Sequence, residues 1–297
     1  MIDKFACVIL NYNDSKTTLD IINRIKDYNN LGHIVIVDNC STDNSYEILK
    51  QKQDSKIVVI KTLKNGGYGA GNNFGINYAT KVLKYRFVLI SNPDVYFEDS
   101  VLEKMLCVLE KNDKCALVAP VQLDSNRRII KEYAWRIPSI FQYIVTSGLI
   151  INKISDTYCY NQKYIVDKKN KIVDCVPGAF LGIDTSKFED EYYDEDFFLY
   201  CEELVIGIKI KNNGFKSYLL VNDRYVHMHG VSINKSISSI YGQRKILTRS
   251  KLLFLKKYLN ANKYEVILGK LFFMISDFES CINERRKKLK LFVHENE

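Results

Sequence analysis

The chain has 297 residues, of which 46% are hydrophobic and 26% charged, so it is not a disordered chain and is long enough for one large domain, or for one domain with an appendage. Its formal net charge of +8 favours anionic partners such as nucleotides or acidic lipid headgroups. The 20 Tyr and 15 Phe residues are spread along the chain without repeated stacking motifs, and we therefore do not expect nucleic acid as a partner.

Buried strands and helices alternate along the first part of the chain. Continuous apolar runs of the kind found in parallel strands covered on both faces occupy residues 5–10, 34–37, 57–60 and 87–90. Apolar residues at helical spacing between these runs predict helices, and a Gly-rich loop over residues 65–75 enters the last of them. This alternation predicts an α/β fold with a doubly wound, mostly parallel sheet.

Polar residues follow three of these strands: residues 11–13, residues 38–39 and residues 92–94. Because the carboxyl ends of parallel strands share one edge of a sheet, we expect these groups to converge. Pro93 has no N–H for the next ladder bond, so Asp94 lies just past the strand end. A carboxylate there suits a divalent metal that carries substrate phosphates. The structural alternative is a turn-forming Asp after a Pro.

Motifs of several other protein classes are missing. The first strand is followed by Asn-Tyr-Asn-Asp-Ser-Lys rather than G-x-G-x-x-G, and the chain has no P-loop motif. None of the eight Cys residues forms a C-x-x-C pair, which argues against a structural zinc site. The beginning of the chain has no signal-peptide pattern, and no apolar run is long enough to span a bilayer. We therefore expect a cytoplasmic protein with free thiols.

Taken together and in order, these motifs resemble the family 2 inverting glycosyltransferases, in particular their rhamnosyltransferase-like members, which have the GT-A fold. The resemblance continues through residues 178–181 and 193–204, ends near residues 227–232, and covers roughly the first 250 residues. It implies a GT-A domain over residues 1–240, with a nucleotide-sugar half of about residues 1–125 and an acceptor half of about residues 126–240. Residues 241–297 would then be a helical, basic C-terminal extension.

The resemblance also implies which residues bind the nucleotide sugar. Asp38 matches the carboxylate that accepts a hydrogen bond from the pyrimidine ring N–H, although it could instead be a strand-end Asp. Asp94 matches the last position of the family's Asp-x-Asp motif, whose first position is Asn92 here, so the diphosphate and water would complete the metal site. The full implied set is Tyr12, Asn13, Asp38, Asn39, Gly71, Asn72, Asn73, Asn92 and Asp94, of which Asn72 and Asn73 could also cap a helix.

On the acceptor side, the resemblance implies that Glu203 is the catalytic base, at a position where the family has Asp, with Glu202 supporting it. Without the resemblance, two acids in a first helical turn would be explained by the helix macrodipole. His227 and His229 alternate along a predicted strand and so share one face. They also match the family's His position, which favours a metal or diphosphate role over hydrogen-bonded core residues, with His227 as the first metal ligand beside Asp94 and His229 as the second. The resemblance adds Gly178, Ala179, Asp194 and Glu195 as acceptor-side residues.

Two further segments carry weaker signals. Residues 127–174 are interpreted as a helical insertion over the acceptor side, to which we assign no chemistry. In the tail, Ile267, Leu271, Phe272 and Ile275 form an apolar stripe ahead of a basic run over residues 285–290. Such a segment suits an anionic membrane surface, a homodimer contact or a packed helix pair with a solvated basic end.

The expected activity is inverting transfer of a sugar from a UDP- or dTDP-linked donor to a hydroxyl of a glycan or lipid-linked acceptor. The resemblance places it in bacterial surface polysaccharide synthesis, with Mg²⁺ or Mn²⁺ as cofactor, in the cytoplasm or at the inner face of the plasma membrane. The alternative is a non-catalytic nucleotide-sugar-binding subunit of a glycosyltransferase complex. A nucleotidyltransferase is disfavoured because its basic, phosphate-binding first loop is missing.

Overall fold

The computed structural model describes residues 4–147, 158–166, 169–189, 191–228 and 240–294. The chain divides into two compact units, which we call the sheet unit (Met1–Ile137 with Cys159–Ile240) and the helical unit (Pro138–Tyr158 with Tyr241–Glu297). This division puts residues 138–158 with the C-terminal helices, whereas the sequence analysis put them in the acceptor half. The boundaries of the functional halves stay a prediction.

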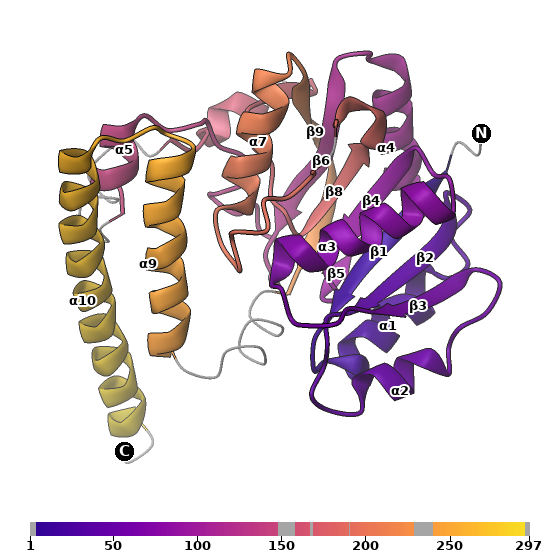
Figure 1. Cartoon of the computed structure of the whole chain (residues 1–297), viewed down its shortest axis with the longest axis horizontal. Coiled ribbons are helices and arrows are strands. Elements are labelled where there is room, and N and C mark those ends of the chain that lie inside the picture. The colour runs from indigo at the N-terminus through magenta and orange to yellow at the C-terminus, as the bar shows by residue number, and fades with distance from the viewer. Residues whose placement is uncertain (1–3, 148–157, 167–168, 190, 229–239, 295–297) are drawn as a thin grey trace. The chain divides into compact units, whose positions relative to one another are not determined.

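Among the described residues, the sheet unit is built on one nine-stranded sheet in the order β3-β2-β1-β4-β8-β6-β9-β5 (Figure 1). Strand β7 lies off this path and pairs with β9. The four strands from β3 to β4 are parallel, as expected, whereas β8 is antiparallel to both β4 and β6. The strands are β1 (Phe5–Asn11), β2 (Leu31–Asp38), β3 (Ile57–Lys61), β4 (Phe87–Ser91), β5 (Val95–Tyr96), β6 (Cys115–Leu123), β7 (Lys171–Val173), β8 (Phe180–Asp184) and β9 (Lys216–His227).

Helices cover both faces of this sheet, as the alternation of strands and helices predicted. Successive strand residues point to opposite faces, so Cys7 and Ile9 of β1 join one buried cluster and Ala6 and Val8 join the other. The first cluster includes α1 (Ser15–Ile25), α2 (Ser45–Lys50) and α4 (Asp99–Lys111). The second includes α3 (Tyr68–Asn77), its π-helical continuation (Tyr78–Val82) and α7 (Glu202–Asn212).

Two strand pairings bring distant segments to the carboxyl edge of the parallel strands. In the antiparallel pair of β4 and β8, Ser91 lies opposite Phe180, and the N–H of Asn92 donates to the carbonyl of Ala179 at 2.8 Å. In the pair of β5 and β9, Val95 lies opposite His227. The chain that follows β4 therefore meets the start of β8 and the end of β9 at one place.

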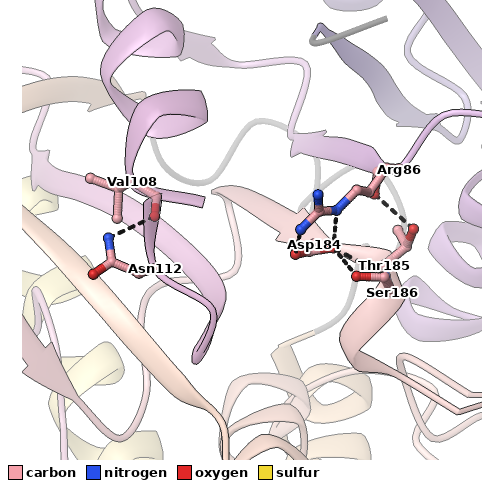
Figure 2. Close-up of polar contacts among 6 residues, drawn as sticks. All are labelled: Arg86, Val108, Asn112, Asp184, Thr185 and Ser186. Atoms are coloured by element: carbon pink, nitrogen blue, oxygen red, sulfur yellow. Dashed lines mark hydrogen bonds and ion pairs between the residues drawn. The ribbon is translucent and has the colours of Figure 1, made fainter. Parts of the chain in front are cut away.

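The other end of the β4–β8 pair is closed by an ion pair (Figure 2). Asp184, which is completely buried, accepts hydrogen bonds from Nε and Nη2 of Arg86 at 3.1 and 2.7 Å. It also accepts from the hydroxyl and the N–H of Ser186 at 2.6 and 3.1 Å. Both carboxylate oxygens are thus satisfied, which makes this aspartate a structural residue.

Residues 127–174 differ from the expected helical insertion. Their described part holds one short α-helix, α5 (Ile140–Val145), a 3-10 turn (Gln162–Ile165) and strand β7. Trp135 and Cys175 exchange two backbone hydrogen bonds at 3.2 and 3.0 Å, so the chain before α5 pairs with the segment between β7 and β8. The helical interpretation is therefore wrong for most of the described residues, because strand pairing overrides the mixed apolar spacing on which it rested.

The helical unit combines α5 with α9 (Ile240–Lys257) and α10 (Lys263–His294). The ring of Tyr143 on α5 packs against Phe254 of α9 and Phe273 of α10, with centroid distances of 5.0 and 6.1 Å. The predicted helical C-terminal extension is confirmed. In the described part of the chain, no helix is long and apolar enough to cross a membrane.

Candidate active site

The loops after β1 and β2 are joined through Asp38. This side chain is completely buried, and it accepts hydrogen bonds from the N–H and the hydroxyl of Ser41 at 2.9 and 2.6 Å and from Nδ2 of Asn11 at 2.9 Å. These three hydrogen bonds leave one lone pair of Oδ1 without a donor from Ser41 or Asn11. In this geometry Asp38 holds two strand-end loops together, and its contact with a base N–H stays a prediction.

Asn13 ties the same two loops at the surface, beside the half-buried Tyr12. Its Nδ2 donates to the hydroxyl of Thr42 at 3.0 Å, and its Oδ1 accepts from the N–H of Thr42 at 2.8 Å. Asn13 and Cys40 both have left-handed backbones, with φ of 52° and 59°. The loops that the resemblance assigns to the nucleoside thus have one defined conformation.

Asn39 attaches the Gly-rich loop to the end of β2. Its Nδ2 donates to Oδ1 of Asn65 and to the carbonyl of Gly67, both at 3.0 Å. Further along the loop, a Cβ at Gly71 would lie 2.3 Å from Cδ1 of Leu10, so only glycine lets α3 approach β1 this closely. Nδ2 of Asn72 donates to the carbonyl of Tyr68 at 3.1 Å, while its buried Oδ1 has no hydrogen-bond partner among the described residues.

Asn73 links α3 to the segment before α7. Its Oδ1 accepts from the N–H of Tyr193 at 2.9 Å, and its Nδ2 donates to the carbonyl of Tyr193 at 2.8 Å and to Oε1 of Glu195 at 3.1 Å. Asp194 is buried and accepts from the N–H of Asp196 at 3.0 Å, whereas Glu195 is exposed. The donor-side and acceptor-side residues expected from the sequence are therefore in contact.

Asp94 and His227 face each other at the edge of the sheet. Nε2 of His227 lies 3.2 Å from Oδ1 of Asp94, and its Nδ1 lies 3.2 Å from Nε2 of Gln122. Oε1 of Gln122 in turn accepts a hydrogen bond from the hydroxyl of Tyr225 at 2.7 Å. Gln122 and Tyr225 are buried, so these contacts hold the imidazole in one orientation. His229, the second predicted histidine ligand, lies outside the described residues.

The Asp94–His227 pair fits a divalent cation. Oδ1 of Asp94 is buried and has no hydrogen-bond partner among the described residues, so it is available to a cation. Two ligands about 2.1 Å from one metal and at right angles to each other lie about 3 Å apart, close to the observed separation. Within the described part of the chain, no group of three or more His, Cys, Asp or Glu residues is arranged to hold a metal ion.

Glu202 and Glu203 begin α7 next to the residues that precede β8. Oε1 of Glu203 accepts from the N–H of Gly178 at 3.3 Å, and the carbonyl of Gly178 accepts from the hydroxyl of Tyr68 at 2.8 Å. A Cβ at residue 178 would lie 2.9 Å from Oε1 of Glu203, so glycine permits this approach. The backbone of Gly178 and Ala179 therefore connects the glutamate pair with Asn92, two residues before Asp94.

Burial changes the protonation of this pair. Burial and the neighbouring charge of Glu203 raise the pKa of Glu202 to about 8, and burial also raises the pKa of Glu203. Because two adjacent buried carboxylates cannot both be charged at low cost, the pair keeps one proton at neutral pH. Glu202, whose Oε1 has no hydrogen-bond partner among the described residues, is then the neutral member, and Glu203 is the carboxylate that can accept a proton.

Backbone strain precedes the glutamates. Tyr200 and Cys201 have φ of 73° and 72°, in the left-handed region that non-glycine residues seldom occupy. Such residues cost on the order of 1–3 kcal/mol each and persist at sites where the surrounding structure fixes them. Here they turn the chain sharply into α7, so that Glu202 and Glu203 occupy its first turn.

The sequence analysis missed several residues that shape this site. Gln122 and Tyr225 are 103 positions apart and meet because β6 and β9 pair in parallel, which no local pattern signals. Tyr193 has a buried hydroxyl without a hydrogen-bond partner among the described residues, and its ring packs edge-on against Tyr68 at 5.9 Å. The order of polar residues at strand ends did predict that Asn11 lies near Asp38, although its role went unrecognised.

Comparisons with known proteins agree with this architecture. A sequence profile described as "Glycosyl transferase family 2" matches residues 6–184, which is more than half of the chain. The low-salt glycan biosynthesis hexosyltransferase Agl10 of Haloferax volcanii is 26% identical over 205 residues, which make up 69% of this chain and 60% of that relative. The chain thus spans less than two thirds of the length of that hexosyltransferase.

Two solved structures share the fold. The S. aureus TarS 1-349 structure in complex with UDP-GlcNAc has a TM-score of 0.52 at 15% identity, over 93% of this chain and 73% of that one. The mannosyltransferase PcManGT from Pyrobaculum calidifontis, in complex with GDP-Man and Mn²⁺, has a TM-score of 0.55 at 11% identity, over 92% of this chain and 70% of that one. At these identities the likeness concerns the fold, and it confirms the expected α/β, GT-A class.

Proposed function

The chain belongs to glycosyl transferase family 2, and from this premise we propose that it is a metal-dependent, inverting enzyme. It moves a hexosyl or deoxyhexosyl group from a nucleotide-diphosphate sugar to a hydroxyl of a glycan or lipid-linked acceptor. We place this transfer in the synthesis of bacterial surface polysaccharide. The observation that carries the proposal is that the Asp94–His227 pair and the Glu202–Glu203 pair lie on either side of Gly178 and Ala179.

On the donor side, Asp94 and His227 would hold the cation, with the diphosphate and water as its further ligands. A divalent cation supplies positive charge that stabilises the departing diphosphate. The support for this assignment is the buried Oδ1 of Asp94 beside a histidine nitrogen at 3.2 Å. The fold relative PcManGT was determined with GDP-Man and Mn²⁺, which is consistent with the choice of a divalent metal.

On the acceptor side, Glu203 accepts the proton of the attacking hydroxyl. Its raised pKa makes it a stronger base than an exposed glutamate, and the N–H of Gly178 orients its Oε1. Glu202 stays protonated at neutral pH, so the negative charge of the pair resides on Glu203. Inversion requires this base to act from the side of the anomeric carbon opposite the diphosphate.

For the donor we propose a UDP- or dTDP-linked sugar, bound by the loops that contain Tyr12, Asn13, Asp38 and Asn39 and by Asn72, Asn73 and Asn92. Solved structures of the same fold contain different donors, UDP-GlcNAc in one and GDP-Man in another. The test must therefore include nucleotide sugars with different bases. The second candidate, a nucleotide-sugar-binding subunit without catalytic activity, is favoured by one observation. Glu203 stands where the family has Asp, and its carboxylate extends one methylene further.

The test is a panel of UDP-, dTDP- and GDP-linked sugars with Mn²⁺ or Mg²⁺, read by thermal shift and by release of the nucleotide. We expect one donor class to stabilise the protein only with metal and to be slowly hydrolysed. Glu203→Gln should keep the thermal shift and lose hydrolysis, while Glu47→Gln, a matched change of an exposed glutamate, should alter neither. Binding without hydrolysis in the unmodified protein would support the subunit, and no binding of any donor would contradict both functions.

A further inference from the structure

Helix α10 has two faces of opposite character. The face that packs within the helical unit holds Phe273 together with the small polar residues Ser276 and Ser280, all at most 7% exposed. Gly269 lies on the same side, where a Cβ would come within 2.6 Å of Leu255 on α9. The packed face is therefore the less apolar one, which is the reverse of an ordinary amphipathic helix in a soluble protein.

The opposite face is a continuous stripe of large apolar side chains at a spacing of three and four residues, so they line one side of the helix. It extends about 21 Å along the helix axis at 1.5 Å per residue. We call it the α10 stripe, and its exposed members, between 42% and 81% accessible, are Tyr264, Ile267, Leu268, Leu271, Met274, Ile275 and Phe278. An apolar patch of this extent marks an interaction surface rather than a chance group of exposed residues.

The structure corrects the stripe expected from the sequence in one position. Phe272 is only half-exposed, whereas Met274 and Phe278 are exposed at 57% and 67%. The surface is thus wider than the sequence suggested, and aromatic side chains lie at both of its ends.

The segment of sequence that contains α10 carries most of the net charge of the chain. Residues 241–297 contain 13 Lys and Arg against 6 Asp and Glu, so they carry +7 of the total formal charge of +8. Five of the six residues from 285 to 290 are basic, and they follow the stripe along α10. The acidic Asp277 is already paired, since it lies 3.3 Å from Nη1 of Arg244 and accepts from the hydroxyl of Thr248 at 2.8 Å.

From this combination we infer that the α10 stripe binds an anionic lipid surface. The helix lies in the membrane interface, with the stripe in the acyl boundary and the basic residues at the headgroups, as an interfacial amphipathic helix does. The inference depends on α10 alone and does not require the proposed sugar transfer.

Charge also argues against a second copy of the chain as the occupant. In a parallel pairing of two α10 helices, the basic run over residues 285–290 would lie against itself. In an antiparallel pairing centred on Leu271, that run would extend past the start of the other α10, toward Lys256, Lys257 and Lys263. Both arrangements bring positively charged segments together, whereas an anionic surface has the opposite charge.

The test is co-sedimentation of the full chain with vesicles of phosphatidylcholine alone or mixed with phosphatidylglycerol. We expect binding to the mixed vesicles, weakening as NaCl is raised, and much weaker binding to phosphatidylcholine alone. Leu271→Asp should reduce partitioning about tenfold or more, because it removes one buried leucine from the contact. Val82→Asp, the same kind of change at a 58% exposed residue of the sheet unit, should bind like the unmodified protein.

Light scattering and circular dichroism complete the experiment. Leu271 is 54% exposed, so the helical signal of Leu271→Asp should equal that of the unmodified protein. A dimer that Leu271→Asp dissociates, in a protein that ignores both kinds of vesicle, would assign the stripe to self-association and overturn the inference. Equal binding to neutral and anionic vesicles would overturn the role of charge, and a monomer without vesicle binding would overturn the inference entirely.

Discussion

The β4–β8 strand pair carries a buried aspartate at each end, and the two have different surroundings. At the end formed by Phe87, Asp184 accepts four hydrogen bonds from Arg86 and Ser186 (Figure 2). Beyond the other end, Oδ1 of Asp94 has no hydrogen-bond partner among the described residues and faces His227 at 3.2 Å. Both side chains are at most 4% exposed.

We propose that the difference separates a structural carboxylate, Asp184, from a ligand-binding one, Asp94. Removing a carboxylate from water costs several kcal/mol unless hydrogen bonds or an opposite charge compensate. Asp184 receives that compensation from four hydrogen bonds, whereas Oδ1 of Asp94 faces one imidazole nitrogen of His227 at 3.2 Å, and we propose that a cation supplies the rest. We therefore expect changes at Asp184 to alter stability and changes at Asp94 to alter activity, and the predictions below test that separation from the largest expected effect to the smallest.

Asp94→Asn should have the largest effect. It preserves the size of the side chain but removes the charge that holds the cation, so we expect activity with Mn²⁺ to fall about 10³-fold, the upper range for losing one electrostatic contact to a transition state. The melting temperature without metal should stay equal or rise, because the variant removes a buried charge that faces one imidazole nitrogen rather than several hydrogen-bond donors. Enzyme kinetics and thermal melts on the same preparation measure both quantities, and a destabilised but active variant would reverse the comparison.

Glu203→Gln should lower turnover about 10²-fold or more, since it removes the general base while preserving size and hydrogen bonding. Donor binding should change little, because Glu203 lies on the acceptor side. Glu203→Asp should retain partial activity. If Glu202→Gln is inactive while Glu203→Gln is active, the base is Glu202.

The dependence of activity on pH tests the assignment of Glu203 as the base. A base must be deprotonated to act, and burial raises the pKa of Glu203 above the ordinary value of 4.5. Activity should therefore increase with pH, with the rising limb at a higher pH than for an exposed glutamate, and then level off. Glu202 has a pKa of about 8 and is therefore neutral while Glu203 titrates, so Glu202→Gln replaces one neutral group by another and should leave the limb in place. A limb that moves to lower pH in that variant would show that Glu202 is charged when Glu203 titrates, and would contradict the assignment of the proton to Glu202.

Asp184→Asn tests the other end of the strand pair. It breaks the paired hydrogen bonds to Arg86, whose side chain is 38% exposed, so the loss should be about 2 kcal/mol, less than for a fully buried pair. For a chain of this size that corresponds to about 5 °C in melting temperature. Activity per folded molecule should remain, and a selective loss of activity would show that this end also serves the site.

Gln122→Met should have a smaller, indirect effect. If Nε2 of His227 binds a metal, the imidazole proton must be on Nδ1. Nδ1 then donates a hydrogen bond to Oε1 of Gln122, which requires the amide group of Gln122 to be rotated by about 180°. Losing that contact typically weakens metal binding about tenfold. Electron paramagnetic resonance of Mn²⁺ in the presence of UDP measures the affinity directly, and Gln53→Met, at an exposed glutamine, is the control. Unchanged affinity would mean that Gln122 supports only the fold.

Local sequence patterns predict the position of Asp94 at a strand end, but they do not predict the surroundings of Asp184. The apolar run of β4 and the proline after Asn92 put Asp94 at a strand end, and the structure confirms the strand over Phe87–Ser91. The parallel strands β1 to β3 follow from similar runs, because strands buried on both faces need continuous apolar residues. The role of Asp184 could not be predicted, since it depends on Arg86, which lies 98 positions away in the sequence.

The geometry of the site depends on contacts of this long-range kind. His227 is oriented by Gln122 from β6, 105 positions away, and the register between β6 and β9 shifts twice along the pair. The left-handed backbones of Tyr200 and Cys201 have no sequence signal, because neither residue is Gly or Asn. Residues 127–174 were misjudged since the bonds of Trp135 with Cys175 are likewise nonlocal.

The most direct test of the comparison is anomalous diffraction from crystals of the protein grown with UDP and Mn²⁺. The account predicts a manganese peak about 2.1–2.2 Å from both Oδ1 of Asp94 and Nε2 of His227, and no peak beside Asp184. The peak at the first position should disappear in Asp94→Asn. Manganese bound to the UDP without either side chain, or a peak at neither position, would contradict the assignment of Asp94 as the carboxylate that awaits a metal.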